Sequence, residues 1–177
     1  MKIVLADVAS ADGFITKGDA PNVSHWSSKE DWEHFLALRQ QYELVVMGRK
    51  TFEAVQPKPE VGRLRVVLTS HPDDYAVVAV TGQLEFSALT PEELVASLKA
   101  RGYNSMLLVG GGAINGAFLA AGLADELYLT IEPTLFGNGT PLLGNAAVDV
   151  ALRLLESRQL NDQGTLLMHY AFVYPNA

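Results

Sequence analysis

Length, composition and charge exclude several classes of protein. The chain has 177 residues, 49% of them hydrophobic, which predicts one domain over residues 1–177 with a sizeable core. It has no cysteine and a net charge of −7, which argues against disulfide or thiolate chemistry and against a broad nucleic-acid-binding face. No apolar run reaches the length of a membrane span and no secretory signal pattern is present, so we expect a cytoplasmic protein. The four histidines lack the spacing of metal ligands, so no metal site is predicted.

The first half of the chain alternates between strand and helix patterns. Strands are expected at 3–8, 44–47, 64–69, 76–80 and 84–86. An amphipathic helix is expected at 31–41, where Ser27 or Ser28 can supply the N-cap. A short helix follows the second strand and ends at Val55, and a turn at 70–73 follows the third.

The second half continues this alternation and then changes to consecutive strands. A capping box of Thr90 and Glu93, with Pro91 between them, predicts a helix at 91–101. Further strands are expected at 105–109, 126–131, 153–159 and 165–174, with a helix after the first of them and a loop at 133–144. Short connections between alternating elements predict an α/β fold. It is a doubly wound, mainly parallel sheet with antiparallel C-terminal strands and helices on both faces.

Three glycines, Gly110 to Gly112, stand where the strand at 105–109 gives way to a helix. Glycines remove every Cβ from a place where the backbone can approach a ligand closely. The following helix offers unpaired N–H groups and the positive end of its dipole, which suits an anion such as a phosphate. The alternative is a tight turn that packs the helix closely against the strand.

Two more loops leave strand ends that a parallel sheet places beside the triple glycine. One contains Gly48, Arg49, Lys50 and Thr51, and the other contains Thr69 and Ser70. Together the three loops describe a crevice for a ligand with several phosphates, which favours a dinucleotide. An Arg beside Ser or Thr suits a 2′-phosphate, so the pattern favours NADPH over NADH.

Asp31 is the strongest candidate for a catalytic acid. Trp26 and Phe35 lie near it in the expected helix region, and an apolar setting would raise the pKa of its carboxyl toward neutrality. The alternative is an acid at a helix start that only complements the helix dipole. Asp12 and Gly13 form a turn signal that could equally be a flap over a site.

Five segments together resemble the dihydrofolate reductase superfamily, in that family's order. They are Trp26-x4-Asp31-x3-Phe35, 46–53, 68–70, 109–112 and 127–130. The first is similar to the substrate helix of that family and the second to its cofactor-phosphate motif. The resemblance implies that Asp31 engages the reduced heterocycle, with Thr130 beside it as the second catalytic residue.

The same resemblance implies an NADPH site and a substrate site. The implied cofactor contacts are Gly48, Arg49, Lys50, Thr51, Thr69 and Ser70 on the adenine side, and Val109, Gly110, Gly111, Gly112, Ala113 and Ile114 around the pyrophosphate. The implied substrate contacts are Val8, Asp12, Trp26, Asp31 and Phe35, of which Phe35 forms an aromatic wall.

Other segments resemble a sister branch, the reductase domain of the bifunctional riboflavin-biosynthesis deaminase/reductase. They are Ser10-x-Asp12-Gly13, the Leu38-Arg39 segment and the loop at 133–139. The zinc pattern of the deaminase half is absent, and residues 53–57 depart from the branch's acidic stretch. The resemblance implies a stand-alone, homodimeric, NADPH-dependent reductase of a nitrogen heterocycle or its ribosylamino derivative. The rivals are a dihydrofolate reductase, a non-catalytic NADP(H)-binding protein and a structural dimer module.

Overall fold

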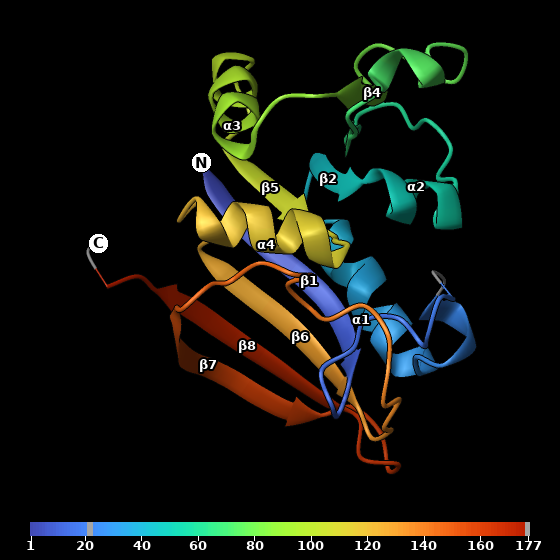
Figure 1. Ribbon diagram of the computed structural model, residues 1–177, viewed down its shortest axis with the longest axis vertical. Coiled ribbons are helices and arrows are strands. Elements are labelled where there is room, and N and C mark those ends of the chain that lie inside the picture. The colour runs from blue at the N-terminus through green and yellow to red at the C-terminus, as the bar shows by residue number, and fades with distance from the viewer. Residues whose placement is uncertain (21–22, 176–177) are drawn as a thin grey trace.

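One eight-stranded sheet forms the centre of the computed structural model, which describes residues 1–20 and 23–175 (Figure 1). Its strands are β1 (Lys2–Ser10), β2 (Leu44–Gly48), β3 (Leu64–Leu68), β4 (Leu84–Ser87), β5 (Ser105–Leu108), β6 (Glu126–Glu132), β7 (Ala151–Gln159) and β8 (Leu166–Val173). The spatial order is β4-β3-β2-β5-β1-β6-β8-β7. The first six of these run parallel, whereas β8 and β7 pair antiparallel.

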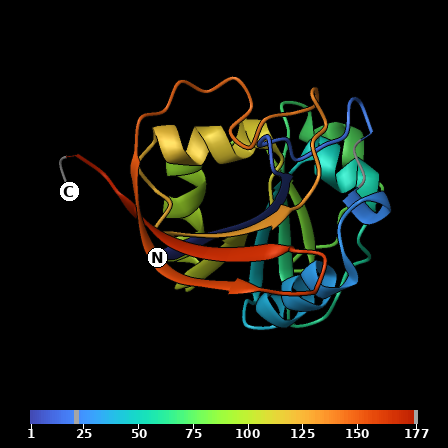
Figure 2. The same ribbon diagram turned by 90° about the horizontal axis from the view of Figure 1, so that it is seen from below.

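Helices cover both faces of the sheet, which confirms the predicted doubly wound fold. They are α1 (Lys29–Arg39), α2 (Arg49–Val55), α3 (Pro91–Ala100) and α4 (Gly112–Ala120), with short 3-10 turns η1 (Val23–His25) and η2 (Pro72–Tyr75). Leu38 of α1 and Phe52 of α2 pack in one buried cluster, and Leu98 of α3 and Phe118 of α4 pack in the other. Figure 2 shows the sheet between α4 and α1. No helix within the described residues combines the length and hydropathy needed to cross a membrane.

Local capping explains where the helices begin. The hydroxyl of Ser28, rather than that of Ser27, accepts the N–H of Asp31 at 3.3 Å, so α1 starts two residues earlier than expected. The predicted capping box of Thr90 and Glu93 is present at α3. Asp31 therefore lies in the first turn of α1, facing the sheet rather than solvent.

One predicted strand is wrong. Residues 76–78 form turns, and Val77 in the middle of them is 98% exposed. Only Val80 pairs there, in an isolated bridge with Leu84. The valines at 77 and 78 favour a strand by composition, but no neighbouring strand or core face is available to bury them.

The sheet order brings the predicted loops together. β3, β2 and β5 are adjacent, so the loops that follow them leave the same edge of the sheet. The N–H of Gly48 donates to the carbonyl of Gly110 at 2.8 Å and joins two of these loops directly. β1 is next in order, followed by β6, and both contribute residues to the same edge.

Candidate functional site

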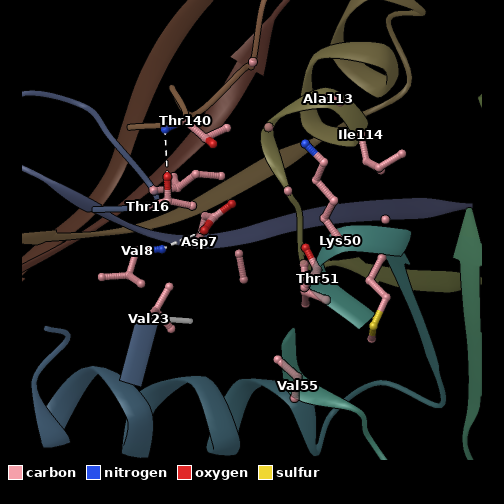
Figure 3. Close-up of a pocket in the computed structure, with 18 of the residues that line it drawn as sticks. Asp7, Val8, Thr16, Val23, Lys50, Thr51, Val55, Ala113, Ile114 and Thr140 are labelled. Atoms are coloured by element: carbon pink, nitrogen blue, oxygen red, sulfur yellow. Dashed lines mark hydrogen bonds between the residues drawn. The ribbon is translucent and has the colours of Figure 1, made fainter. Parts of the chain in front are cut away.

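A cavity of about 770 Å³ opens at the carboxyl ends of the parallel strands (Figure 3). Loops after β2, β3 and β5 line one part of it, which we call the loop end: Gly48–Thr51, Thr69–Ser70 and Gly111–Ile114. β1, α1 and β6 line the other part, which we call the acid end: Asp7, Asp31 and Thr130. Of the remaining predicted site residues, Val8, Phe35 and Val109 also line this cavity. The expectation that separate motifs converge on one crevice is met.

The three consecutive glycines Gly110 to Gly112 have different roles. Gly110 adopts a φ of +75°, a left-handed conformation that favours glycine, and it does not line the cavity. A Cβ on Gly112 would lie 2.4 Å from the carbonyl oxygen of Pro141, so this glycine lets the 133–144 loop pack against α4. Gly111 caps α4 at an ordinary φ of −74°, and a Cβ there would lie 3.5 Å from Thr51 Oγ1. The left-handed φ explains Gly110 and close packing explains Gly112, whereas Gly111 lines the cavity and a Cβ there would make only ordinary contacts.

The cations of the loop end are exposed, and one of them is already paired. Arg49 donates two hydrogen bonds to the carboxylate of Glu53, at 2.8 and 2.9 Å, and Tyr75 donates a third to the same carboxylate. These bonds, that of Tyr75 first, hold the pKa of Glu53 below its usual value. Figure 3 shows the Lys50 side chain extending toward the turn before Ala113.

Small polar groups complete the loop end. The hydroxyl of Ser70 lies 2.8 Å from His71 Nδ1, and the hydroxyl of Thr69 accepts the backbone N–H of His71 at 3.2 Å. Gly48 lines the cavity, and a Cβ there would also lie 2.8 Å from the side chain of Ile114. The absence of a Cβ therefore also lets β2 approach α4 closely.

Asp31 is the predicted acid, and the structure places it in a desolvated position. Its side chain is 7% exposed, and burial raises the pKa of its carboxyl to about 6. Side-chain hydrogen bonds from Thr130 and Ser27 lower that pKa, and the charge of Glu132 raises it. Thr130 therefore lies beside Asp31, as the family resemblance implied.

Asp12 and Trp26 were expected at the substrate site and lie outside the residues that line the cavity. The carboxylate of Asp12 accepts the Ser10 hydroxyl at 2.6 Å and the N–H of Gly137 at 2.8 Å, and these bonds lower its pKa to about 2. The ring of Trp26 packs edge-on against Phe136, with centroids 4.9 Å apart. Both residues attach the N-terminal part of the chain to the 133–144 loop, which is a structural role.

Sequence reasoning missed Asp7, Arg39 and Arg65 as cavity residues. Arg39 was quoted only as part of a resemblance to the sister branch. Asp7 and Arg65 did carry a signal, because each is a charged residue inside an otherwise apolar strand pattern. A charge in a buried strand is rare unless it is paired or functional.

Three arginines meet a single carboxylate where the cavity reaches β3. Arg65 is 3% exposed and donates to Glu60 at 2.6 Å and to the carbonyl of Lys58 at 2.9 Å. Arg63 pairs with the same carboxylate, and Arg39 reaches it at 3.5 Å. Burial, and then the charges of Arg63 and Arg65, lower the pKa of Arg39. The cluster keeps an excess of positive charge, so it can attract an anionic group of a ligand.

Comparison with known protein families identifies the family of this chain. The model of the RibD C-terminal domain matches residues 1–166. The chain belongs to this family. A Bacillus subtilis relative, the uncharacterized protein YwjB, is 27% identical over 176 residues, which cover 96% of this chain and 97% of YwjB.

Solved structures share the fold of this family member. A Thermotoga maritima diaminohydroxyphosphoribosylaminopyrimidine deaminase/5-amino-6-(5-phosphoribosylamino)uracil reductase matches with a TM-score of 0.76 and 18% identity, over 97% of this chain and 56% of that protein. An Enterococcus faecalis dihydrofolate reductase complexed with NADP(H) matches with a TM-score of 0.68 and 22% identity, over 97% of this chain and 96% of that one. The fold is therefore that of dihydrofolate reductase, as the sequence motifs implied. Within the described residues, no group of three or more His, Cys, Asp or Glu side chains is arranged to hold a metal ion.

Proposed function

We propose that this family member is an NADPH-dependent reductase of the riboflavin-biosynthesis type, which transfers a hydride to a nitrogen heterocycle or its ribosylamino derivative. The observation that carries the proposal is a single cavity with an anion-binding loop end and a buried carboxyl at the acid end. A dinucleotide and a small heterocycle together need both features.

The residues of the loop end fit the phosphates of NADPH. Gly111 leaves room for a pyrophosphate at the N-terminus of α4, and Lys50 supplies a positive charge beside it. Arg49 and Ser70 line the same part of the cavity and suit a 2′-phosphate. When bound, the cofactor supplies the hydride.

The residues of the acid end fit the heterocycle. A carboxyl with a pKa of about 6 exchanges protons near neutral pH, so Asp31 can hold a ring nitrogen and provide the proton that accompanies hydride transfer. Thr130 orients that carboxyl, and Phe35 adds an apolar wall to the cavity.

The arginine cluster supports a substrate that carries an anionic group. Arg39 and Arg65 line the cavity and have only the Glu60 carboxylate as a counter-charge in the described part of the chain. The phosphate of 5-amino-6-(5-phosphoribosylamino)uracil fits this charge. A dihydrofolate is the second candidate, because Asp31 suits a pterin ring and the folate carboxylates also suit arginines.

Steady-state NADPH oxidation tests the proposal with two substrates, dihydrofolate and 5-amino-6-(5-phosphoribosylamino)uracil. We expect turnover with the ribosylamino substrate to exceed turnover with dihydrofolate. A protein that binds NADPH in calorimetry but turns over neither substrate would be a non-catalytic binding protein. Absence of NADPH binding would contradict the proposal altogether.

A further inference from the structure

Asp7 is a partly buried acid that the proposed function leaves without a role. It is the only acidic residue of β1, and Ala6 before it and Val8 after it are both buried. Asp7 lines the cavity, and Figure 3 shows its side chain across the cavity from Lys50 and Thr51. No cation within the described residues pairs with its carboxylate. A charge in such a place needs an explanation.

The contacts of Asp7 leave part of its hydrogen-bonding capacity unused. Oδ2 accepts Nδ2–H of Asn115 at 2.9 Å, and Oδ1 accepts the backbone N–H of Val8 at 3.1 Å. Nδ2 of Asn115 also donates a hydrogen bond to the carbonyl of Leu142, at 2.9 Å. A carboxylate can accept about four hydrogen bonds, so two acceptor positions of this cavity-lining carboxyl are unused in the described residues.

Within the acid end, Asp7 is the residue that lies next to the glycine turn of the loop end. On one side its Oδ2 lies 2.9 Å from where a Cβ of Gly110 would be, so the carboxyl rests directly against the glycine turn. On the other side, Val8 pairs in register with Thr130, the partner of Asp31. A dinucleotide with its pyrophosphate at Gly111 and its adenosine toward Ser70 must extend its other half past β1, because the sheet order is β3-β2-β5-β1.

We propose that the carboxyl of Asp7 contacts the carboxamide of the cofactor's nicotinamide half and thereby orients the ring that gives up the hydride. The inference rests on the proposed function. A carboxamide offers an N–H donor and a carbonyl acceptor side by side, and a carboxylic acid offers the complementary acceptor and donor. Burial raises the pKa of Asp7 to about 7, so the acid form is populated near neutral pH. The charge of Asp31 contributes to that rise, and the bonds from Asn115 and Val8 oppose it.

Titration calorimetry with two ligands tests the contact. NADPH carries the nicotinamide half, and adenosine 2′,5′-bisphosphate lacks it but keeps the adenine-side phosphates. We expect Asp7→Leu to weaken NADPH binding about tenfold, the usual effect of losing a hydrogen bond to a charged or strongly polar group, and to leave the bisphosphate within about twofold. Asp7→Asn, which keeps an acceptor and a donor, should retain most of the NADPH affinity.

A second measurement compares two cofactors, and its result for the parent protein does not depend on the folding of a variant. The reduced 3-acetylpyridine analogue of NADPH replaces the amide NH₂ by a methyl group. We expect the parent to bind this analogue about fivefold more weakly than NADPH, and Asp7→Leu to bind the two alike.

Four results would overturn the inference. Equal binding of NADPH and the analogue by the parent would mean that no such contact exists. Equal losses of NADPH and bisphosphate affinity in Asp7→Leu would mean that Asp7 only supports the glycine turn through Asn115. A parent that binds neither nucleotide would overturn the proposed function and this inference together, whereas bisphosphate binding with an unaltered NADPH affinity in the variant would overturn this inference alone.

Discussion

The loop end and the acid end of the cavity are built in opposite ways. At the loop end, Arg49 and Lys50 are exposed, and the groups that can bind an anion come from short segments that follow single strands. At the acid end, Asp7 and Asp31 lie on different elements, and burial raises the pKa of each carboxyl. The cations of the loop end are therefore exposed to solvent, whereas burial disfavours the ionised form of the carboxyls at the acid end.

The difference indicates how the two ends contribute to function. An exposed cation costs little to maintain and contributes modestly to binding, because solvent and salt screen it. A desolvated acid opposes folding while it is ionised, but its proton becomes available near neutral pH. We therefore expect changes at the acid end to alter turnover and pH dependence, and changes at the loop end to alter cofactor affinity.

The largest effect is expected from Asp31→Asn, which keeps the shape of the side chain and removes its charge. We predict a decrease in kcat of about 10²-fold or more, as for the loss of a general acid, with unchanged NADPH affinity. Glu30→Gln, at the neighbouring position of α1, is the matched control and should leave kcat within about twofold. Turnover of Asp31→Asn within a few-fold of the parent would remove Asp31 from the mechanism.

A pair of glycine variants separates ligand binding from packing at the loop end. Gly112→Ala places a Cβ 2.4 Å from the carbonyl oxygen of Pro141, so the free energy of unfolding in urea should fall by about 1–3 kcal/mol. Gly111→Val has an ordinary φ and no such clash, so it should stay folded and lose about tenfold or more in NADPH affinity. If Gly111→Val binds NADPH as tightly as the parent, the turn does not hold the pyrophosphate.

Asp7→Asn should remove part of the pH dependence of stability. The pKa of Asp7 is about 7 in the folded protein against 3.8 for an ordinary Asp, so the folded state binds the proton more tightly than the unfolded state. Stability due to this group is therefore fully present below about pH 4 and declines as the pH rises to about 7. At about pH 8, Asp7→Asn should be more stable than the parent by on the order of 2 kcal/mol, and by much less near pH 4. Urea unfolding at the two pH values measures this, and an equal difference at both would contradict the raised pKa.

Arg49 should contribute less to NADPH binding than an unpaired arginine, because Glu53 already holds its guanidinium. We predict that Arg49→Ala weakens NADPH binding by about 1 kcal/mol and leaves NADH binding unchanged. Glu53→Gln should strengthen NADPH binding slightly, because it frees the arginine for the 2′-phosphate. Calorimetric losses that are equal for the two cofactors would contradict the 2′-phosphate assignment.

The smallest effect on ligand binding is expected from changes at β7, the edge strand of the sheet farthest from β4. We propose a homodimer contact at this edge. Leu152, Leu154 and Leu155 of β7 are 45%, 50% and 41% exposed and form an apolar edge. The proposed contact also includes the alternating apolar side chains of the adjacent β8: Leu166, Met168, Tyr170 and Phe172. Leu154→Lys should shift the protein from dimer to monomer in light scattering and leave NADPH affinity within about twofold. A monomeric parent at micromolar concentration would contradict the proposal.

Much of the fold and of the loop end could be predicted from the sequence because both depend on local patterns. Apolar runs of strand length, the capping box at Thr90 and glycines at strand ends each specify structure within a few residues. The strand predicted at 76–80 is absent because its valines favour a strand only where a neighbouring strand and a core face are present. That requirement is not local.

The properties of the carboxyls at the acid end depend on the tertiary structure. Asp31 stood out in the sequence, but its raised pKa depends on burial against β6 and on the charge of Glu132, which lies about a hundred residues away. Asp12 looked like a site residue and instead binds the backbone of Gly137, 125 positions along the chain. Asp7 has its amide partner Asn115 108 positions away. Desolvation and long-range hydrogen bonds set the properties of a carboxyl, and both arise only when distant segments pack together.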